Sequence, residues 1–405
     1  MGTVAERVRA EIDLDAITHN LRYAQVRVGG SVGVMAVVKA DAYGHGAVEV
    51  AHAAVSGGAA ALGVATVAEA VELRDAGLRV PIVVIGSCLR EEIAPAFGRG
   101  ISLSVSPGEL FWPMVEEAES LGGSSAVHLL VDTGVSRDGV SPEEALELAE
   151  HIELSPALHL EGTYTHLATA SLADKSFCHE QLDRFGRLID QMLSRDIQPG
   201  RIHAANSGAL FTLRSSHFDM VRQGITLYGL APSDHVAGEV DLVPAMSVVS
   251  RVIAVKEIEP GESVGYGRGF VARRPTRLAT VPMGYADGLR VPPAGRGHVL
   301  ISGRSVPLVG PVMMDSSVAD VTDLPGVRIG DPVVVMGQSG RQRITAADIA
   351  ERTGSTVYQV VCGFGRRVRR TYIRNGRRAV LPDRAGGLGL PEATDASRPP
   401  IDRRL

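Results

Sequence analysis

The sequence predicts a (β/α)8 barrel followed by a mostly-β domain, because the pattern of apolar residues changes once along the chain. From residue 13 to 240, short apolar runs alternate with amphipathic stretches, which is typical of a barrel of parallel strands. From 241 to 383, strand follows strand with Gly and Pro between them, and residues 1–12 are expected to join this β-rich domain. Residues 384–405 are rich in Gly, Pro, Asp and Arg, so we expect them to be disordered.

Eight apolar runs in the first part are the predicted barrel strands. They are Val34–Val38, Ala61–Ala65, Pro81–Ile85, Ile101–Val105, Val127–Val131, Leu158–Thr163, Ile202–Ala204 and a last one near Met220 to Tyr228. Predicted helices between them are Ala47–Ala54, Thr66–Ala76, Glu91–Phe97, Pro142–His151 and Glu180–Ser194. A helix from Asp15 to about Val26 precedes the first strand, and Asp13 or Asp15 is its expected N-cap.

The second part contains six predicted strands and one predicted helix. The strands are Met246–Val255, Leu278–Pro282, Val299–Ile301, Val306–Val309, Ser317–Val321 and Pro332–Met336. The helix is predicted over Thr345–Arg352. We expect Gly354 to end it, because glycine readily takes the left-handed conformation of a helix C-cap.

The composition excludes several classes of protein. A net charge of −5, a pI of about 6.2 and 4% aromatic residues argue against binding to nucleic acid. Three widely spaced cysteines indicate neither a disulfide framework nor a metal site, and they favour a reducing compartment. No run resembles a signal peptide or is long enough to span a membrane, so we expect a cytoplasmic protein.

A lysine stands where such a barrel has its functional residues. The apolar run Val34–Val38 ends at Lys39, and the carboxyl ends of barrel strands are where catalytic side chains lie. Only three of the 41 lysines and arginines of the chain are lysines. A lysine here therefore favours chemistry that arginine cannot perform, such as forming a Schiff base as a neutral amine. The alternative is a lysine that ends a strand and extends into solvent.

Several motifs, in order along the chain, resemble those of the alanine racemase family. The run Lys39-Ala-Asp-Ala-Tyr43-Gly-His-Gly resembles the family's pyridoxal-phosphate signature. Further segments match the family in the same order: Asp132-Thr133-Gly134 with Arg137 and Gly139, Thr165–Ala170, His203–Gly208, Val221–Gly229, Gly284–Gly288 and Val312–Asp315. The resemblance extends from about residue 8 to about residue 380, and several independent motifs carry it.

The resemblance implies an amino-acid racemase that binds pyridoxal 5'-phosphate through Lys39 and interconverts L- and D-alanine. Racemisation needs acid/base groups on both faces of the substrate, because one group alone would return the proton to the face it left. The resemblance assigns these two roles to Lys39 and to Tyr285, which reaches the site from the other subunit. It therefore implies an obligate homodimer with shared active sites. Taken alone, Tyr285 would be an ordinary tyrosine of a β domain.

The other expected site residues also follow from the resemblance. Arg222 would donate to the pyridine nitrogen; because arginine keeps its proton, that nitrogen would stay unprotonated and the cofactor would be a weaker electron sink. His166 would orient Arg222. Further cofactor contacts are expected from Tyr43, Asn206, Ser207, Gly224, Ile225 and Tyr358, and substrate contacts from Arg137, Met314 and Asp315. Taken singly, these could be a surface arginine, a core histidine, a helix N-cap at Ser207 and a solvated Arg137.

Four positions depart from the family pattern. Leu130 stands where many relatives have a lysine that becomes carbamylated and steadies the neighbouring arginine. Either Asp138 or a bound anion must then position Arg137, or that arginine is freer. Near the family's substrate entrance, an arginine, an acid and a tyrosine are replaced by Pro311, Ser171 and Arg366. These departures raise the hypothesis of a substrate other than alanine, and drift within an arginine-rich lineage is the alternative.

The sequence leaves three functions open. The first is an alanine racemase that supplies D-alanine for bacterial peptidoglycan, and the second is a racemase or epimerase of another amino acid in specialised metabolism. The third is a non-catalytic pyridoxal-phosphate carrier, although single-barrel carriers lack a second domain like the one predicted here. A decarboxylase of the same barrel class is a further rival. Arg222 argues against it, because those enzymes place an acid at the pyridine nitrogen.

Overall fold

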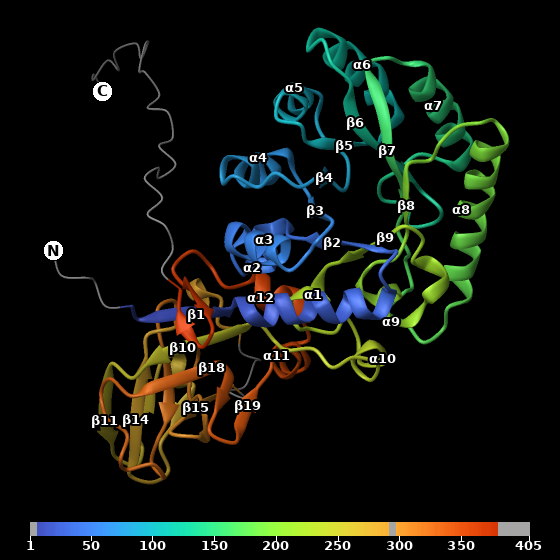
Figure 1. Cartoon of the computed structure of the whole chain (residues 1–405). Coiled ribbons are helices and arrows are strands. Elements are labelled where there is room, and N and C mark those ends of the chain that lie inside the picture. Colours follow the sequence, from blue (N-terminus) through green and yellow to red (C-terminus); the bar gives the residue numbers. More distant parts are fainter. Residues whose placement is uncertain (1–5, 291–296, 380–405) are drawn as a thin grey trace, which may run out of the picture.

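The computed structural model describes residues 6–290 and 297–379 of the chain. Figure 1 shows an α/β part that contains the barrel and, beside it, a β-rich part that packs against one end of helix α1. The disorder expected for residues 384–405 concerns a segment outside the described residues. No helix in the described ranges is both long and apolar enough to cross a membrane.

Eight parallel strands form the barrel sheet in the order β8-β7-β6-β5-β4-β3-β2-β9. Their bounds are β2 Gly33–Val37, β3 Ala61–Val64, β4 Ile82–Val84, β5 Ser102–Val105, β6 Ser125–Val131, β7 Leu158–Thr165, β8 Arg201–His203 and β9 Met220–Gln223. Between the end strands, Asp219 N–H donates to Ile202 O at 3.0 Å and Arg222 N–H donates to Ala205 O at 2.9 Å, which nearly closes the barrel. The predicted barrel is confirmed, and each predicted strand overlaps an observed one. The last, expected near Met220 to Tyr228, ends at Gln223, and Ile225–Tyr228 form a short 3-10 helix.

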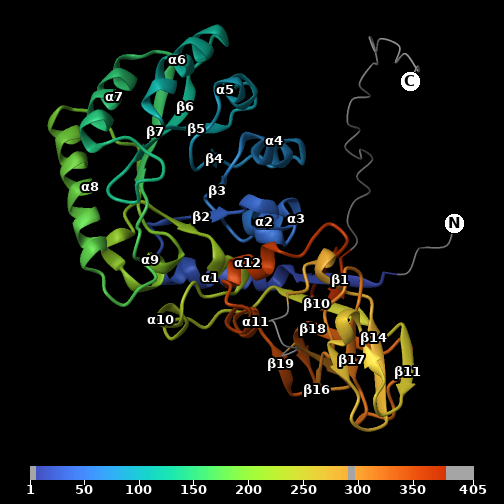
Figure 2. The ribbon, with the colours of Figure 1, turned by 180° about the vertical axis from the view of Figure 1, so that it is seen from behind.

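Helices cover the outer face of the barrel sheet (Figures 1 and 2). Their bounds are α1 Leu14–Val28, α3 Ala47–Ser56, α4 Val67–Asp75, α5 Ile93–Phe97, α6 Phe111–Ser120, α7 Pro142–Leu154, α8 Ser176–Ser194, α9 Ser207–Thr212 and α10 Asp234–Ala237. Short 3-10 helices are η1 Arg90–Glu92, η2 Gly108–Leu110, η3 Arg214–Ser216 and η4 Ile225–Tyr228. Asp13 caps α1, as expected, by accepting from the backbone N–H groups of Asp15 and Ala16. Helix α6 was not predicted; it contains Pro113, which is tolerated because it lies in the first turn of the helix.

The β-rich part contains an eight-stranded sheet, a three-stranded sheet and a two-stranded ribbon. The large sheet comprises β1 Val8–Asp13, β10 Met246–Arg251, β15 His298–Ile301, β16 Arg304–Pro307, β18 Pro332–Ser339, β19 Gln342–Ile344, β20 Arg369–Arg374 and β21 Arg377–Arg378. The smaller sheets comprise β11 Ala254–Ile258, β14 Thr276–Val281 and β17 Ser317–Asp320, and then β12 Ser263–Val264 and β13 Phe270–Val271. Helices here are α11 Ala346–Thr353, α12 Val357–Cys362, η5 Tyr266–Arg268 and η6 Tyr285–Asp287. The first strand of the chain, β1, pairs antiparallel with β10 and parallel with β20.

One strand prediction was wrong in this part. Met246–Val255 is not one strand, because β10 and β11 belong to different sheets. The break falls where neighbouring residues bond in different directions: Val252 N–H donates to Asp331 O, and Ile253 N–H donates to Thr280 O. The predicted helix is confirmed as α11, and Gly354 ends it with a φ of 62°.

Helix α12, which was not predicted, brings the β-rich part to the barrel mouth. It lies against α2 (Lys39–Gly44), the segment that follows strand β2 (Figures 1 and 2). The approach is close, because a Cβ on Gly44 would lie 2.5 Å from the carbonyl oxygen of Val361. Gly44 also has a φ of 80°, so glycine is needed here on both counts. The packing places Tyr358 of α12 beside Tyr43 of α2, with ring centroids 6.1 Å apart.

Candidate active site

Lys39 begins a turn of left-handed backbone. The residues Ala40–Tyr43 all have φ between 51° and 53°, a conformation that costs L-residues about 1–2 kcal/mol each. Surrounding hydrogen bonds hold the turn: the Asp41 carboxylate accepts from Ala47 N–H at 2.8 Å, and Ala42 N–H donates to Val38 O at 2.9 Å. The turn sets the direction of the Lys39 and Tyr43 side chains at the end of the first barrel strand.

Glu69 joins this turn to the next strand, although it was not among the site residues expected from the sequence. One carboxylate oxygen accepts from Ala40 N–H at 2.7 Å, and the other accepts from Ala65 N–H at 2.8 Å. Glu69 also forms a capping box with Thr66 at the start of α4. The Thr66-x-x-Glu69 spacing was visible in the sequence, but its second contact, with the Lys39 turn, depends on strand pairing.

The surroundings of Lys39 lower the pKa of its amine. Burial, and then the charges of Arg137 and Arg222, lower the pKa of Lys39 below its usual 10.5, while Glu69 acts in the opposite direction. An amine that loses its proton readily can act as a nucleophile and as a base. The structure therefore places Lys39 among positive charges, rather than extended freely into solvent.

Arg222 is buried at the end of β9, with its guanidinium inside the barrel. Nη1 donates to His203 Nδ1 at 2.9 Å and to His203 O at 3.1 Å. Nη2 donates to the carbonyl oxygens of Thr165 at 2.7 Å and Ala204 at 3.0 Å, and lies 3.3 Å from His166 Nδ1. These acceptors are all neutral, and within residues 6–290 and 297–379 no carboxylate forms an ion pair with the arginine. Among the described residues Nε–H has no hydrogen-bond acceptor.

His166 and His203 both contact Arg222, and both are held neutral. Burial and the Arg222 charge lower the pKa of His166 to about 3, and they lower that of His203 well below its usual 6.5. The expected contact of His166 with Arg222 is present, but the His203 contact is shorter. In the sequence, His203 is visible only as part of a motif. Its role depends on β8 and β9 lying side by side at the barrel closure.

Four of the expected cofactor residues meet in one cradle. Gly224 N–H donates to Ser207 Oγ at 2.8 Å, and Tyr43 stands over both with Tyr358 behind it. A Cβ on Gly224 would lie 2.8 Å from Tyr43 Oη and 3.4 Å from Ser207 Oγ, so only glycine leaves this space open. Ile225 follows as the first residue of η4.

Asn206 organises the wall of this cradle. Its side chain caps α9 by accepting from the backbone N–H groups of Gly208 and Ala209, and it donates to Leu167 O at 3.0 Å. The alternative that Ser207 is a helix N-cap is therefore wrong, because Asn206 has that position. The Ser207 hydroxyl is left to face Gly224 and Thr226.

Arg137 is held by its neighbour Asp138. Arg137 Nε donates to Asp138 Oδ2 at 2.9 Å, and Ser87 donates to the other carboxylate oxygen at 3.1 Å. Leu130 is buried, with 5% of its surface exposed, and offers no polar group. Of the possibilities left open by Leu130, the structure contains the contact with Asp138.

Tyr285, Met314 and Asp315 form a second group, in the β-rich part. The backbone joins their loops, because Tyr285 N–H donates to Met313 O at 3.0 Å and Ala286 N–H donates to Met314 O at 3.1 Å. Arg367 links Asp315 to Asp287, with N···O distances of 2.7 and 3.0 Å. The Tyr285 side chain is 56% exposed. The described contacts do not join this group to Lys39 within one chain.

The three residues that replace the expected entrance side chains lie in different surroundings. Pro311 would contact a Cβ on either Gly265 or Gly269, Ser171 O accepts from Ser233 Oγ at 2.6 Å, and Arg366 is exposed. Within the described ranges, no three His, Cys, Asp or Glu side chains are grouped as metal ligands.

Comparison with known families assigns both parts of the chain. The family model "Alanine racemase, N-terminal domain" matches residues 12–232, and "Alanine racemase, C-terminal domain" matches residues 245–372. The chain belongs to the alanine racemase family. The members most similar in sequence include alanine racemase 2 of Caldanaerobacter subterraneus, which is 40% identical over 91% of this chain and 95% of its own length. An alanine racemase of Halothermothrix orenii is also 40% identical, over 90% of this chain and 96% of its own length.

Solved structures of the family share the fold. The alanine racemase of Clostridium difficile 630 has a TM-score of 0.89 at 33% identity, covering 93% of this chain and 98% of its own. The alanine racemase of a D-cycloserine-producing Streptomyces lavendulae has a TM-score of 0.86 at 35% identity, covering 92% and 98%. The family resemblance and the predicted fold class are thereby confirmed.

Proposed function

We propose that this protein is a pyridoxal-phosphate-dependent alanine racemase with two bases, Lys39 and Tyr285 of the partner subunit. Membership of the alanine racemase family over both domains supports the reaction. Within the site, one observation carries the proposal: Lys39, whose pKa is lowered, shares the barrel mouth with Arg222, whose described hydrogen-bond acceptors are all neutral. That combination suits a cofactor enzyme that must move a proton and keep the amino group on its substrate.

The residues present fit the cofactor. The space at Gly224, which a Cβ would fill, is lined by the hydroxyls of Tyr43 and Ser207, with the Tyr358 ring behind Tyr43. Hydroxyls and backbone N–H groups beside a short helix late in such a barrel suit a phosphate. Lys39 would hold the cofactor until the substrate amine takes its place, which would free the Lys39 amine. The bound cofactor would then withdraw electrons from the substrate's Cα and make its proton removable.

Lys39 then acts on one face of the substrate, where its amine takes up or returns the Cα proton. The opposite face needs a second group, and the exposed phenol of Tyr285 is the group that a partner subunit would insert. Because hydrogen bonds join the Tyr285 loop to Met314, the partner's Met314 and the partner's Asp315 would enter with it. The complete site therefore requires a homodimer.

Arg222 sets the outcome of the reaction. Its guanidinium keeps its proton, and its remaining Nε–H would donate to the pyridine nitrogen. A pyridine nitrogen that stays unprotonated makes a weaker electron sink, which favours return of the proton to Cα over transfer of the amino group to the cofactor. Arg137, steadied by Asp138, would bind the substrate carboxylate.

We place this activity in the cytoplasm, supplying D-alanine for peptidoglycan. The three widely spaced cysteines, which suggest no disulfide framework, support that location. Racemisation of another amino acid is the second candidate. The replacements Pro311, Ser171 and Arg366 favour it, because they remove an arginine, an acid and a tyrosine expected near the substrate entrance.

Exchange of the α-proton in D2O tests the proposal. The protein, loaded with pyridoxal phosphate, is incubated with L- and D-forms of alanine, serine, larger aliphatic and basic amino acids, and exchange and optical inversion are followed together. We expect both to be fastest with alanine. Inversion fastest with another amino acid would select the second candidate. Exchange without inversion, or neither, would reject a two-base racemase.

A further inference from the structure

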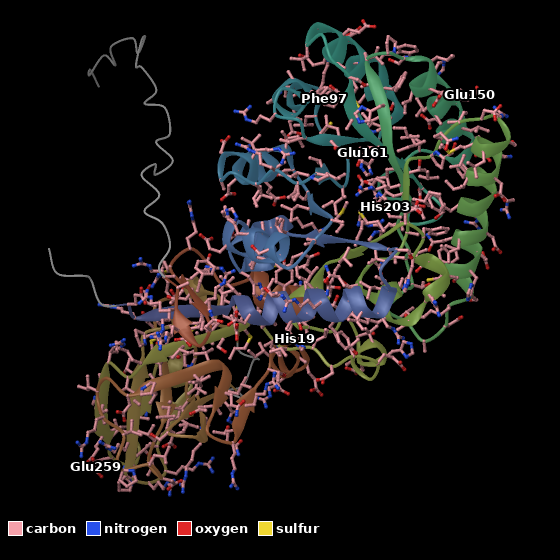
Figure 3. The ribbon with its side chains drawn as sticks, in the orientation of Figure 1. His19, Phe97, Glu150, Glu161, His203 and Glu259 are labelled. Carbon is pink, nitrogen blue, oxygen red and sulfur yellow. The ribbon has the colours of Figure 1, made fainter. Side chains whose placement is uncertain are left out.

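A column of polar side chains runs through the barrel below Arg222. It contains His203 at the end of β8, His128 in the middle of β6 and Glu161 in the first half of β7. His203 and His128 are 0% and 1% exposed. Figure 3 labels Glu161 and His203 among the strands of the barrel. Barrel interiors are usually filled by branched apolar residues, so the presence of these polar side chains requires an explanation.

The hydrogen bonds of the column can run in only one direction. Arg222 has donors only, so His203 Nδ1, at 2.9 Å, must accept from it. A neutral imidazole then carries its proton on Nε2, which donates to His128 Nδ1 at 3.1 Å. By the same argument His128 carries its proton on Nε2 and donates to Glu161 Oε2 at 3.2 Å.

Glu161 is the last residue in this series of hydrogen bonds, and it is an ionised acceptor. Hydrogen bonds from His128 and then from Ser102, whose Oγ lies 2.6 Å from the carboxylate, lower the pKa of Glu161 to about 2, although burial opposes this. The carboxylate is therefore charged at neutral pH and cannot donate. Arg222, at one end of the column, only donates, and the Glu161 carboxylate, at the other end, only accepts. Both ends therefore require the same tautomers of His203 and His128.

The packing leaves the two rings little freedom to turn. The His203 ring is stacked on Tyr164, with centroids 4.7 Å apart and planes 5° apart, and Tyr164 Oη lies 2.7 Å from Ser104 Oγ. Gly162 makes room for His128, because a Cβ there would lie 2.6 Å from the ring. Arg222 itself lies over the Tyr164 ring at 5.2 Å. If a proton moved to the other nitrogen of either histidine, these fixed neighbours would hinder the ring from turning to suit it.

We propose that Glu161 is a positioning residue of this enzyme, which fixes the tautomers of His128 and His203 and thereby holds the Arg222 guanidinium on the pyridine nitrogen. The role given to Glu161 rests on the proposed function, whereas the hydrogen-bond geometry of the column does not depend on it. With no acceptor at position 161, His128 is free to place its proton on Nδ1. His203 would then carry a proton on Nδ1, directed at the N–H of Arg222, and the arginine would be displaced.

Nitrogen NMR of the cofactor-loaded protein tests the geometry directly. Protein labelled with 15N in its histidine rings distinguishes protonated from unprotonated ring nitrogens, and single His→Gln variants assign the signals. We expect His128 and His203 to be neutral, each with its proton on Nε2. Glu161→Leu should convert both to mixtures. Glu161→Gln should keep the wild-type tautomers, because its amide oxygen can still accept from His128.

Kinetics and the cofactor's visible absorbance supply the second readout. In Glu161→Leu we expect kcat to fall about tenfold with KM little changed, as for other partners that orient a ligand-binding group. We also expect faster loss of absorbance per turnover, since a displaced Arg222 allows the amino group to pass to the cofactor with release of the keto acid. The matched control is Glu153→Leu, an exposed glutamate on α7, which should change neither readout.

The outcomes separate the inference from the function. Wild-type tautomers and wild-type absorbance loss in a folded Glu161→Leu would overturn the positioning role. A proton on Nδ1 of His203 in the wild type would overturn it as well. If the tautomers respond as expected but no amino acid is racemised, the inference stands and the proposed function fails. If Glu161→Leu does not fold, His128→Leu breaks the next link, and an unchanged His203 tautomer there would overturn the inference.

Discussion

Single residues at the barrel mouth owe their chemistry to charges that converge from distant parts of the sequence. Lys39 lies near Arg137, from the loop after β6, and near Arg222, at the end of the last barrel strand. In the part of the chain that the structure describes, Arg137 pairs with its own neighbour Asp138, and Arg222 donates only to neutral acceptors. Their charges lower the pKa of the Lys39 amine, against the opposing effect of Glu69, and they also lower the pKa of His166.

The first prediction concerns the protonation of Lys39. In protein freed of cofactor, labelling of Lys39 by an amine-reactive reagent should reach half its maximal rate at a lower pH than labelling of exposed Lys256. The reason is that burial and two guanidinium groups lower the pKa of Lys39 below 10.5. Mass spectrometry of both peptides from one sample gives the two pH midpoints. A midpoint for Lys39 at or above that of Lys256 would contradict the electrostatics.

A second prediction tests the phosphate cradle. Gly224→Ala should raise the dissociation constant of pyridoxal phosphate about tenfold or more, because its Cβ would lie 2.8 Å from Tyr43 Oη. Equilibrium titration of the cofactor's absorbance measures this. The control is Gly186→Ala in α8, where no heavy atom lies within 4 Å of the new Cβ. Equal affinities in the two variants would show that the cradle does not bind the cofactor.

Among the elements, the left-handed turn after β2 is the one whose conformation opposes the intrinsic preference of its residues. Ala40, Asp41 and Ala42 are all L-residues with positive φ. The turn persists because Glu69 accepts from Ala40 N–H and Val38 O accepts from Ala42 N–H. The Asp41 carboxylate also accepts from Ala47 N–H of α3, and α12 packs against Gly44. Strain of this kind accumulates at functional sites, where the surrounding structure overdetermines the conformation.

The third prediction measures that strain. Ala40→Gly should leave the thermal midpoint of the holoenzyme unchanged or raise it, because relief of about 1 kcal/mol at φ 53° offsets the greater flexibility of glycine in the unfolded chain. Ala347→Gly, at an exposed position in the right-handed helix α11, should lower stability by about 0.5 kcal/mol. Calorimetry compares the two variants. An equal loss in both would mean that the turn is not strained.

At the scale of the whole molecule, the site residues of one chain fall into two groups. Lys39, Tyr43, Arg222 and their neighbours meet at the barrel mouth, and α12 adds Tyr358 from the β-rich part of the same chain. Tyr285, Met314 and Asp315 lie together on another loop pair of that part, with Tyr285 56% exposed. In a head-to-tail dimer, the first group of each chain would meet the second group of the partner chain, which would give two complete sites.

The fourth prediction follows from that arrangement. Lys39→Ala and Tyr285→Phe should each abolish racemisation, whereas co-expression of the two should restore it in about a quarter of the sites. Half of randomly assembled dimers contain one chain of each kind, and one of their two sites then combines both intact residues. Racemase assays on the purified mixture measure the recovery. No recovery, with mixed dimers demonstrated by two affinity tags, would place Tyr285 in the site of its own chain.

Local patterns were sufficient for much of this protein. The eight barrel strands, the Asp13 cap and the Gly354 stop depend on apolar period and on capping residues, which are properties of neighbours in sequence. The expected residues around Arg222 and Gly224 also lie close together, since loops at the same end of parallel strands must converge. The family resemblance was carried by the same local motifs.

Contacts between distant segments needed the folded chain. The split of Met246–Val255 between two sheets, the approach of α12 to Gly44, and the second contact of Glu69 all depend on which strands become neighbours. So does the column from Arg222 through His203 and His128 to Glu161, whose members lie on four different strands. The sequence by itself determined the eight barrel strands and the position of Lys39 at the end of the first of them, because these follow from short-range periodicity. Only the tertiary structure decided which histidine nitrogens face Arg222, because hydrogen-bond direction is set by partners far apart in the chain.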